Sequence, residues 1–202
     1  INTHYQKAAV SLSKARQKSS VVLEQAVCKK LADLGMDGAT FSIFLKPRKE
    51  PLHLHGLEDI EFLVSTNPKQ PARPLARVAS GGELSRISLA IQVVTANTSR
   101  VPTLVFDEVD VGIGGAIAEV VGSLLRHLGE SAQIICVTHL PQVAAQGHHH
   151  LQVTKDSERE QMINIEDLTG TVRISEIARM LGGIEITDQS LAHAEQMLAD
   201  VS

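Results

Sequence analysis

Aromatic side chains are nearly absent from this chain of 202 residues, which has one Tyr, no Trp and an aromatic content of 2%. Hydrophobic residues still make up 43% of the chain, so its core must be aliphatic. The two cysteines show no C-x-x-C spacing, and Cys136 lies in an apolar run, which predicts a buried, reduced thiol. The net charge of −4 argues against a broad basic surface that coats nucleic acid.

Targeting signals are missing as well. The sequence contains no signal peptide, no transmembrane run and no lipidation motif, which predicts a cytoplasmic protein without a membrane partner. The first residue is Ile1 and not Met, which suggests a fragment or a processed chain.

A long helix is expected at the start of the chain, over residues 3–34. This stretch contains no proline, and Gly35 stands where a helix C-cap would fall. Its apolar seam is poor, so two interpretations remain open. Residues 1–35 are either the end of a coiled coil that enters a globular lobe of residues 36–202, or an amphipathic helix packed on that lobe.

The rest of the chain predicts an α/β fold with a parallel sheet core, flanking helices and an antiparallel strand pair before them. Alternating apolar residues predict the antiparallel pair at 41–45 and 60–64. Apolar runs on either side of a helical pattern predict two buried parallel strands. The remaining expected elements are helices near 80–97, 116–128, 174–181 and 190–199, parallel strands at 101–106 and 134–137, and short strands at 151–154 and 162–165.

A Ser-Gly-Gly turn opens the helix near residue 80. Ser80 is placed as an N-cap, and Glu83 follows three residues later as in a capping box. An apolar face of Leu84, Ile87, Ile91 and Val94 then follows at helical spacing. Such a helix end, with uncovered amide groups, binds phosphate, although an ordinary capped helix explains the pattern about equally well.

Polar side chains follow both predicted parallel strands. Asp107 and Glu108 end the first strand, and His139 follows the second. An acid after an apolar strand is the Walker B arrangement, which holds Mg²⁺, and the next acid can act as a general base toward water. Asp110 and the glycines after it form a loop suited to close backbone approach. Taken singly, each of these residues also has a purely structural interpretation.

Other candidate sites are weaker. The run His148, His149 and His150 suggests a metal site, but consecutive residues rarely point the same way, so we interpret them as residues of an exposed turn. His53 and His55 are interpreted in the same way. The sequence has no G-x-x-x-x-G-K-[ST] motif and no Gly-Lys dipeptide. We therefore expect that this chain alone does not hydrolyse ATP well, and that its phosphate-cradling loop lies on another segment or chain.

Three stretches together resemble the C-terminal part of the RecN family, bacterial repair ATPases for DNA double-strand breaks that are related to SMC proteins. They are VASGGELSR at 78–86, LVFDEVDVGIGG at 104–115 and VTHLPQVA at 137–144. The wider ABC-ATPase class shares only the Ser-Gly-Gly signature, the Asp-Glu pair, an Asp of the D-loop and the switch His. The resemblance runs over nearly the whole chain and implies the C-terminal lobe of an ABC/SMC-type ATPase head.

The resemblance also implies roles for individual residues. Asp107 would support Mg²⁺, Glu108 would be the catalytic base and His139 would sense the γ-phosphate of ATP. The signature residues would bind ATP in trans, on the second head of a homodimer, and Asp110 would cross that interface. The signature residues concerned are Ser80, Gly81, Gly82 and Glu83.

The partners implied are an N-terminal lobe that carries Walker A, a second head and double-stranded DNA, in a cytoplasmic, nucleoid-associated protein. The first hypothesis is therefore an ATP-hydrolysing head that joins or holds DNA ends during recombinational repair. The alternative is an SMC-like tether in which ATP binding matters more than turnover. A transporter subunit is disfavoured, because the long helix enters directly before this lobe.

Overall fold

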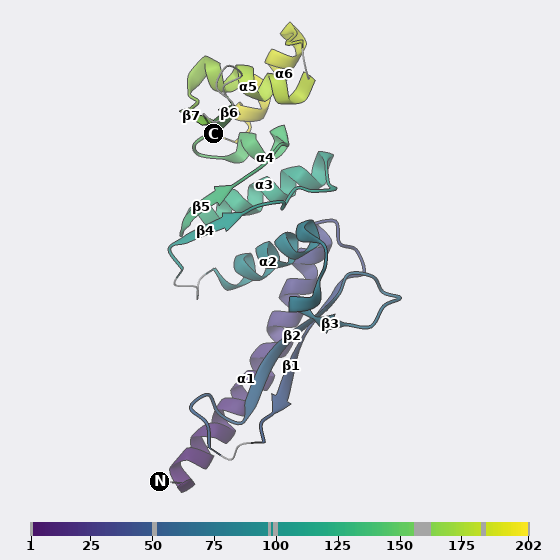
Figure 1. Cartoon of the computed structure of the whole chain (residues 1–202), viewed down its shortest axis with the longest axis vertical. Helices are drawn as coiled ribbons and strands as arrows, with labels where there is room; N and C mark the ends of the chain where they lie inside the picture. Colours follow the sequence, from purple (N-terminus) through teal and green to yellow (C-terminus); the bar gives the residue numbers. More distant parts are fainter. Residues whose placement is uncertain are drawn as a thin grey trace. The chain divides into compact units, whose positions relative to one another are not determined.

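A computed structural model describes residues 2–49, 52–96, 98, 101–155, 163–182 and 185–201. The chain forms two compact units, Ile1–Ser99 and Arg100–Ser202 (Figure 1). None of the described helices is both long and apolar enough to cross a bilayer.

The first unit begins with the expected long helix, α1 (Asn2–Asp33). Its end is a Schellman motif, in which Met36 N–H donates to Leu31 C=O at 2.9 Å and Gly35 N–H donates to Ala32 C=O at 3.0 Å. Gly35 has a φ of 72°, a left-handed conformation that glycine adopts without steric cost. The sequence thus predicted both the helix and the residue that stops it.

A three-stranded antiparallel sheet follows, formed by β1 (Thr40–Pro47), β2 (Glu58–Ser65) and β3 (Arg73–Pro74). The predicted antiparallel pairing of β1 and β2 is confirmed, with Ile43 opposite Phe62. The short β3 and the 3₁₀ turn after it, η1 (Leu75–Arg77), were not predicted.

The helix α1 runs along this sheet (Figure 1) and covers the free edge of β1. The backbone N–H of Ile43 donates to Glu24 Oε1 at 2.7 Å, and that of Phe41 donates to Cys28 Sγ at 3.3 Å. Arg16 also pairs with Glu58 at 3.2 Å. The two bonds to Phe41 and Ile43 satisfy an edge that would otherwise be open to pairing with another chain, and the Arg16–Glu58 pair ties the helix to β2. The helix is therefore packed on the sheet, while Val22, 68% exposed, lies on its solvent face.

The last helix of the first unit is α2 (Gly81–Thr95), which packs against α1. Its buried residues are Gly82, Ile87, Leu89 and Ala90. The predicted apolar face was partly wrong, because Leu84 is 39% exposed and the buried face is centred further round the helix. The helix was expected to reach Asn97, which lies outside the described residues.

The second unit is built on two parallel strands, β4 (Thr103–Phe106) and β5 (Gln133–Cys136). The crossover between them is α3 (Gly115–Gly129), as the alternation of patterns predicted. The prediction that both strands are buried was wrong. Val105 is 66% exposed and Ile135 is 47% exposed, because the described sheet has two strands and one of its faces is open.

The remaining elements complete the second unit. They are α4 (Pro141–Gln146), β6 (Leu151–Lys155), β7 (Ile163–Asp167), α5 (Gly170–Gly182) and α6 (Asp188–Ala199). The helices α5 and α6 each start earlier than predicted, and α6 begins with a capping box between Thr187 and Ser190. A small core joins α4, α5 and α6 around Ala145, Ile177 and Ala194.

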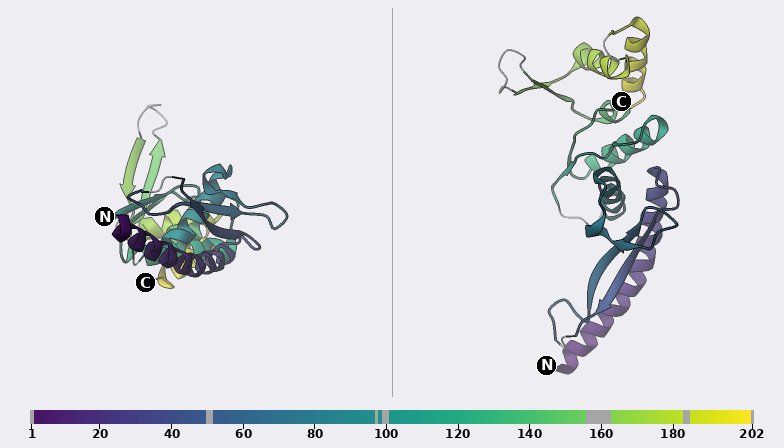
Figure 2. Two further views of the ribbon diagram at one scale, coloured as in Figure 1. Left: turned by 90° about the horizontal axis from the view of Figure 1, so that it is seen from below. Right: turned by 45° about the vertical axis from the view of Figure 1, so that its right-hand side comes forward.

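The predicted antiparallel pairing of β6 and β7 is confirmed, with Val153 opposite Ile165, whereas Met162 lies outside the described residues. Both strands project away from α5 and α6 (Figure 2). Residues opposite one another or two apart share a face of a strand pair, so Leu151, Val153, Ile163 and Ile165 lie on one face. Each of the four is at least 60% exposed, so the hairpin carries an open apolar face.

Candidate functional site

The polar residues predicted to form a site gather at one edge of the second unit, where β4 and β5 end. The two strands run in register, with Phe106 opposite Cys136, and Val137 N–H donates to Phe106 C=O at 2.9 Å. Asp107 and Glu108 follow β4 directly, and His139 follows β5. In open α/β sheets, ligands bind at such carboxyl ends.

Glu108 has a left-handed backbone, with a φ of 58°. It is the only non-glycine residue with a positive φ in the described parts of the chain. Its N–H donates to Asp107 Oδ1 at 2.9 Å, which fixes the two acids relative to each other. A non-glycine residue in this conformation costs of order 1–3 kcal/mol, and such residues cluster at functional sites.

Asp110 connects the loop after β4 to the segment after β5. Its side chain is 2% exposed, and its Oδ2 accepts hydrogen bonds from Thr138 Oγ1 and from the backbone N–H of His139. His139 Nδ1 lies 3.3 Å from the same oxygen, while the His139 side chain stays 70% exposed. The carboxylate expected at a dimer interface is thus bonded inside its own unit. Sequence reasoning missed Thr138 as its partner.

The pKa of Cys136 reflects both its burial and the negative charges at this sheet edge. Burial, and then the negative charges of Asp110 and Asp107, raise the pKa of the Cys136 thiol to about 12. Cys136 is therefore a neutral thiol at physiological pH, and it is half-buried and not fully buried as predicted. A site whose charge is negative enough to act on a neighbouring thiol is suited to a cation.

The Ser-Gly-Gly turn belongs to the first unit. Ser80 Oγ accepts the N–H of Glu83 at 3.4 Å, which is one half of the predicted capping box. The reciprocal bond from the Glu83 side chain does not form among the described residues. Ser80 and Gly81 are exposed and Gly82 is buried, so the turn presents its first residues to solvent.

The histidines set aside in the sequence lie outside helices and strands. His55, His148 and His149 are exposed as expected, whereas the expectation was wrong for His53 and His150, which are half-buried. Burial, followed by the charge of Arg173, lowers the pKa of His150. The rings of His53 and His55 lie 5.3 Å apart. Across the residues that the structure describes, no three His, Cys, Asp or Glu side chains are grouped to hold a metal ion.

The fold resembles solved SMC heads. The Smc head domain with a coiled coil and joint from Pyrococcus yayanosii gives a TM-score of 0.57 at 17% identity, over 92% of this chain and 30% of that one. The Smc head from Pyrococcus furiosus bound to the C-terminal domain of ScpA gives 0.54 at 18% identity, over 84% of this chain and 39% of that one. The chain therefore has the fold of an SMC-type head over the part that these structures match.

Sequence comparison finds relatives that are more similar to this chain than the solved structures are. The DNA repair protein RecN of Vibrio cholerae is 48% identical over 195 residues, which is 95% of this chain and 35% of the relative. RecN of Xylella fastidiosa is 47% identical over 203 residues, with coverages of 98% and 36%. The chain thus matches the C-terminal part of RecN, and it spans about a third of the length of these relatives. No family model matches it.

Proposed function

We propose that this chain is the C-terminal lobe of the ATP-hydrolysing head of a RecN-like DNA repair protein. The observation that carries the proposal is the placement of Asp107, Glu108 and His139 at one sheet edge, where Asp110 of the loop after β4 bonds His139. ATP hydrolysis needs three groups from the Walker B side of a nucleotide site: a metal ligand, a general base and a hydrogen-bond donor to the γ-phosphate.

Asp107 would hold Mg²⁺, directly or through water. The side chain is exposed, and the carboxylates of Asp107, Glu108 and Asp110 all belong to the loop at this sheet edge, so the residues present fit a cation. Mg²⁺ prefers one or two carboxylates together with phosphate oxygens, and a single acid here is compatible with that pattern. When bound, the ion would neutralise charge that develops on the phosphates of ATP.

Glu108 would accept the proton of the attacking water, and His139 would donate a hydrogen bond to the γ-phosphate. Asp110 would act as a positioning residue. Its buried carboxylate holds both the backbone N–H and Nδ1 of His139, which restricts how the ring can turn. The imidazole ring would therefore already be oriented before ATP binds.

The Ser80–Glu83 turn would bind the phosphates of ATP held by another head, so that ATP joins two heads into a dimer. The turn supports this role because Ser80 and Gly81 are exposed and because a helix N-terminus favours an anion. In the loop that starts at Asp110, the interface contact would fall to the exposed Val111 and Gly112, since the Asp110 carboxylate is buried.

An N-terminal lobe would supply the Walker A loop and cover the open apolar faces of the second unit. The strand pairs β4–β5 and β6–β7 both expose apolar side chains, among them Val105, Ile135 and Ile165. Exposed apolar surface of this kind marks a site of association. We place the assembled protein in the cytoplasm, near the nucleoid.

Its role would be the repair of DNA double-strand breaks. The relatives in Vibrio and Xylella are DNA repair proteins, and a structure from a study of ATP-driven dimerization and DNA-stimulated activation of SMC ATPases matches 85% of this chain at a TM-score of 0.51. The proposal is tested by Glu108→Gln in the complete protein. ATP binding should persist, while hydrolysis should fall by at least about 100-fold.

A further inference from the structure

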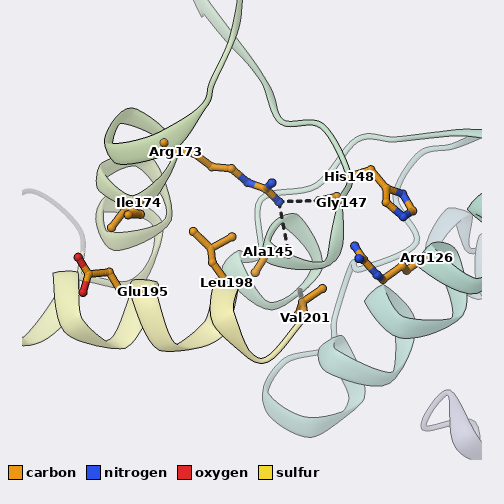
Figure 3. A pocket seen from close by; sticks show the side chains of 10 residues that line it. Arg126, Ala145, Gly147, His148, Arg173, Ile174, Glu195, Leu198 and Val201 are labelled. Carbon is orange, nitrogen blue, oxygen red and sulfur yellow. Dashed lines mark hydrogen bonds between the residues drawn. The ribbon is translucent and has the colours of Figure 1, made fainter.

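A pocket of about 430 Å³ opens among α3, α4, α5 and α6 of the second unit (Figure 3). Its volume falls within the range of about 300–1,000 Å³ that is typical of small-molecule sites. None of the residues proposed to act on ATP lines it. It is therefore a separate feature of the C-terminal part of the chain.

Two arginines from different helices define one side of the pocket. Arg173 of α5 donates through Nη2 to the carbonyl oxygens of Gly147 at 2.6 Å and Ala145 at 3.2 Å. Arg126 of α3 donates through Nη1 to the carbonyl oxygen of Gln146 at 2.9 Å. Figure 3 shows both side chains reaching toward this stretch, next to His148. Backbone carbonyls thus hold both guanidinium groups in fixed places before any ligand binds.

The positive charge of these arginines is not balanced. Within the described residues, neither Arg126 nor Arg173 forms an ion pair with a carboxylate. Burial, and then the charge of Arg126, lowers the pKa of Arg173, so the two cations oppose each other. Among the residues that the structure describes, the buried Arg173 Nε has no hydrogen-bond partner. Carbonyl groups at the end of α4 offer only a partial negative charge, so an anion in the pocket would be stabilised.

The single carboxylate in the lining is that of Glu195, on α6. Figure 3 shows it at the opposite end of the pocket from Arg126 and His148. The pocket is therefore polarised, with its cationic groups gathered at the end near Gly147. This arrangement favours a ligand whose anionic group lies at that end.

We propose that the pocket binds a phosphate group, held by the guanidinium groups of Arg126 and Arg173. A guanidinium donates two parallel hydrogen bonds to neighbouring phosphate oxygens, and two such groups match a multiply charged phosphate. The phosphate could come from a small phosphorylated compound or from the backbone of DNA. Both sources present the same chemistry to the two arginines.

The test follows the Nε–Hε signals of the arginines by NMR in the complete protein, labelled with ¹⁵N-arginine and titrated with inorganic pyrophosphate. The Arg126 signal, assigned by its loss in Arg126→Gln, should shift and saturate. Because the signal is local, pyrophosphate at the ATP site does not register. Binding measured at the Arg173 signal should weaken at least about tenfold in Arg126→Gln and persist or strengthen in Glu195→Gln. Lys18→Gln, which removes an exposed charge in α1, should leave it unchanged.

The proposal is overturned if the Arg126 signal does not move, or if Arg126→Gln binds as well as the parent protein. If Arg126→Gln fails to fold, Arg126→Lys replaces it in the test. This variant keeps a positive charge, so it should keep part of the affinity for pyrophosphate. Competition then identifies the source of the phosphate. Displacement of pyrophosphate by a duplex without terminal phosphates indicates DNA, and displacement only by a mononucleotide indicates a small compound.

Discussion

Asp110 and His139 are joined twice, although they are 29 residues apart in the sequence. The backbone N–H of His139 donates to Asp110 Oδ2 at 3.2 Å, and His139 Nδ1 lies 3.3 Å from the same oxygen. The same carboxylate accepts a hydrogen bond from Thr138. One buried carboxylate therefore fixes the segment after β5 against the loop after β4. It also fixes the position of His139, the residue proposed to contact the γ-phosphate.

This network predicts strong coupling between Asp110 and Thr138. Thr138→Val keeps the shape and removes the hydroxyl, so it should lower the free energy of unfolding by about 1–2 kcal/mol. In the background of Asp110→Ala the same change should cost little. Chemical denaturation of both single variants and the double variant should give a coupling energy of at least about 1 kcal/mol. Simple additivity of the two changes would show that the bond contributes nothing.

The left-handed backbone of Glu108 predicts a gain in stability on Glu108→Gly. Glycine adopts a φ of 58° without steric cost, so the variant should be more stable than the parent by up to about 1 kcal/mol, although it loses the proposed base. The matched control is Glu119→Gly at an exposed position inside α3, which should cost about 1 kcal/mol. Equal destabilisation of both variants in thermal unfolding would argue against strain at Glu108.

The exposed signature turn predicts a selective defect for Ser80→Arg. In the complete protein, this variant should still bind ATP to a single head but should not form dimers with ATP, because the long cation fills the proposed phosphate site. Loss of the N-cap should also lower stability by about 1 kcal/mol, so folding must be checked. Light scattering with ATP measures the dimer, and Ser175→Arg, at an exposed position of α5, is the control. ATP-driven dimers of Ser80→Arg would refute the trans role.

An ion pair in α5 between the buried Glu176 and the exposed Arg179 predicts a pH-dependent contribution to stability. Glu176, 8% exposed, accepts hydrogen bonds from Arg179 Nε and Nη2, both at 2.7 Å. These bonds lower the pKa of Glu176 despite its burial. Since the folded-state pKa lies below the unfolded one, the stabilisation is present above the unfolded pKa and is lost as the pH falls through the folded value.

Glu176→Gln should therefore cost about 1–2 kcal/mol at neutral pH. The difference from the parent protein should shrink as the pH falls below the usual glutamate pKa of about 4.3. Denaturant unfolding across this range measures it, with the exposed Glu119→Gln as control. A difference that stays constant into acid would mean that the charge of Glu176 does not contribute.

Local patterns in the sequence were enough to predict most elements of this fold. Three features depend on neighbouring residues or on simple alternation, and they could therefore be predicted from the sequence. They are the end of α1 at Gly35, the pairing of β1 with β2 and the N-cap at Ser80. The open face of β4 and β5 was not predictable, because an apolar strand does not reveal how many strands lie beside it.

The candidate site was predictable in part. Two acids and a histidine after apolar runs indicate a shared edge once a parallel sheet is assumed, and β4 and β5 form that sheet. The bond between Asp110 and Thr138 was not predictable, because no local spacing relates residues 28 positions apart. The adjacency of Thr138 to His139 was the one available signal.

The most direct test of the proposed composite site is ATP turnover by this chain mixed with a separately produced N-terminal lobe, with and without linear double-stranded DNA. We expect turnover only when both lobes are present, a change in rate on adding DNA, and a loss of at least about 100-fold with Glu108→Gln. An assembled head that binds ATP without turning it over would contradict this account. Such a result would favour the SMC-like tether, in which the nucleotide acts as a clamp.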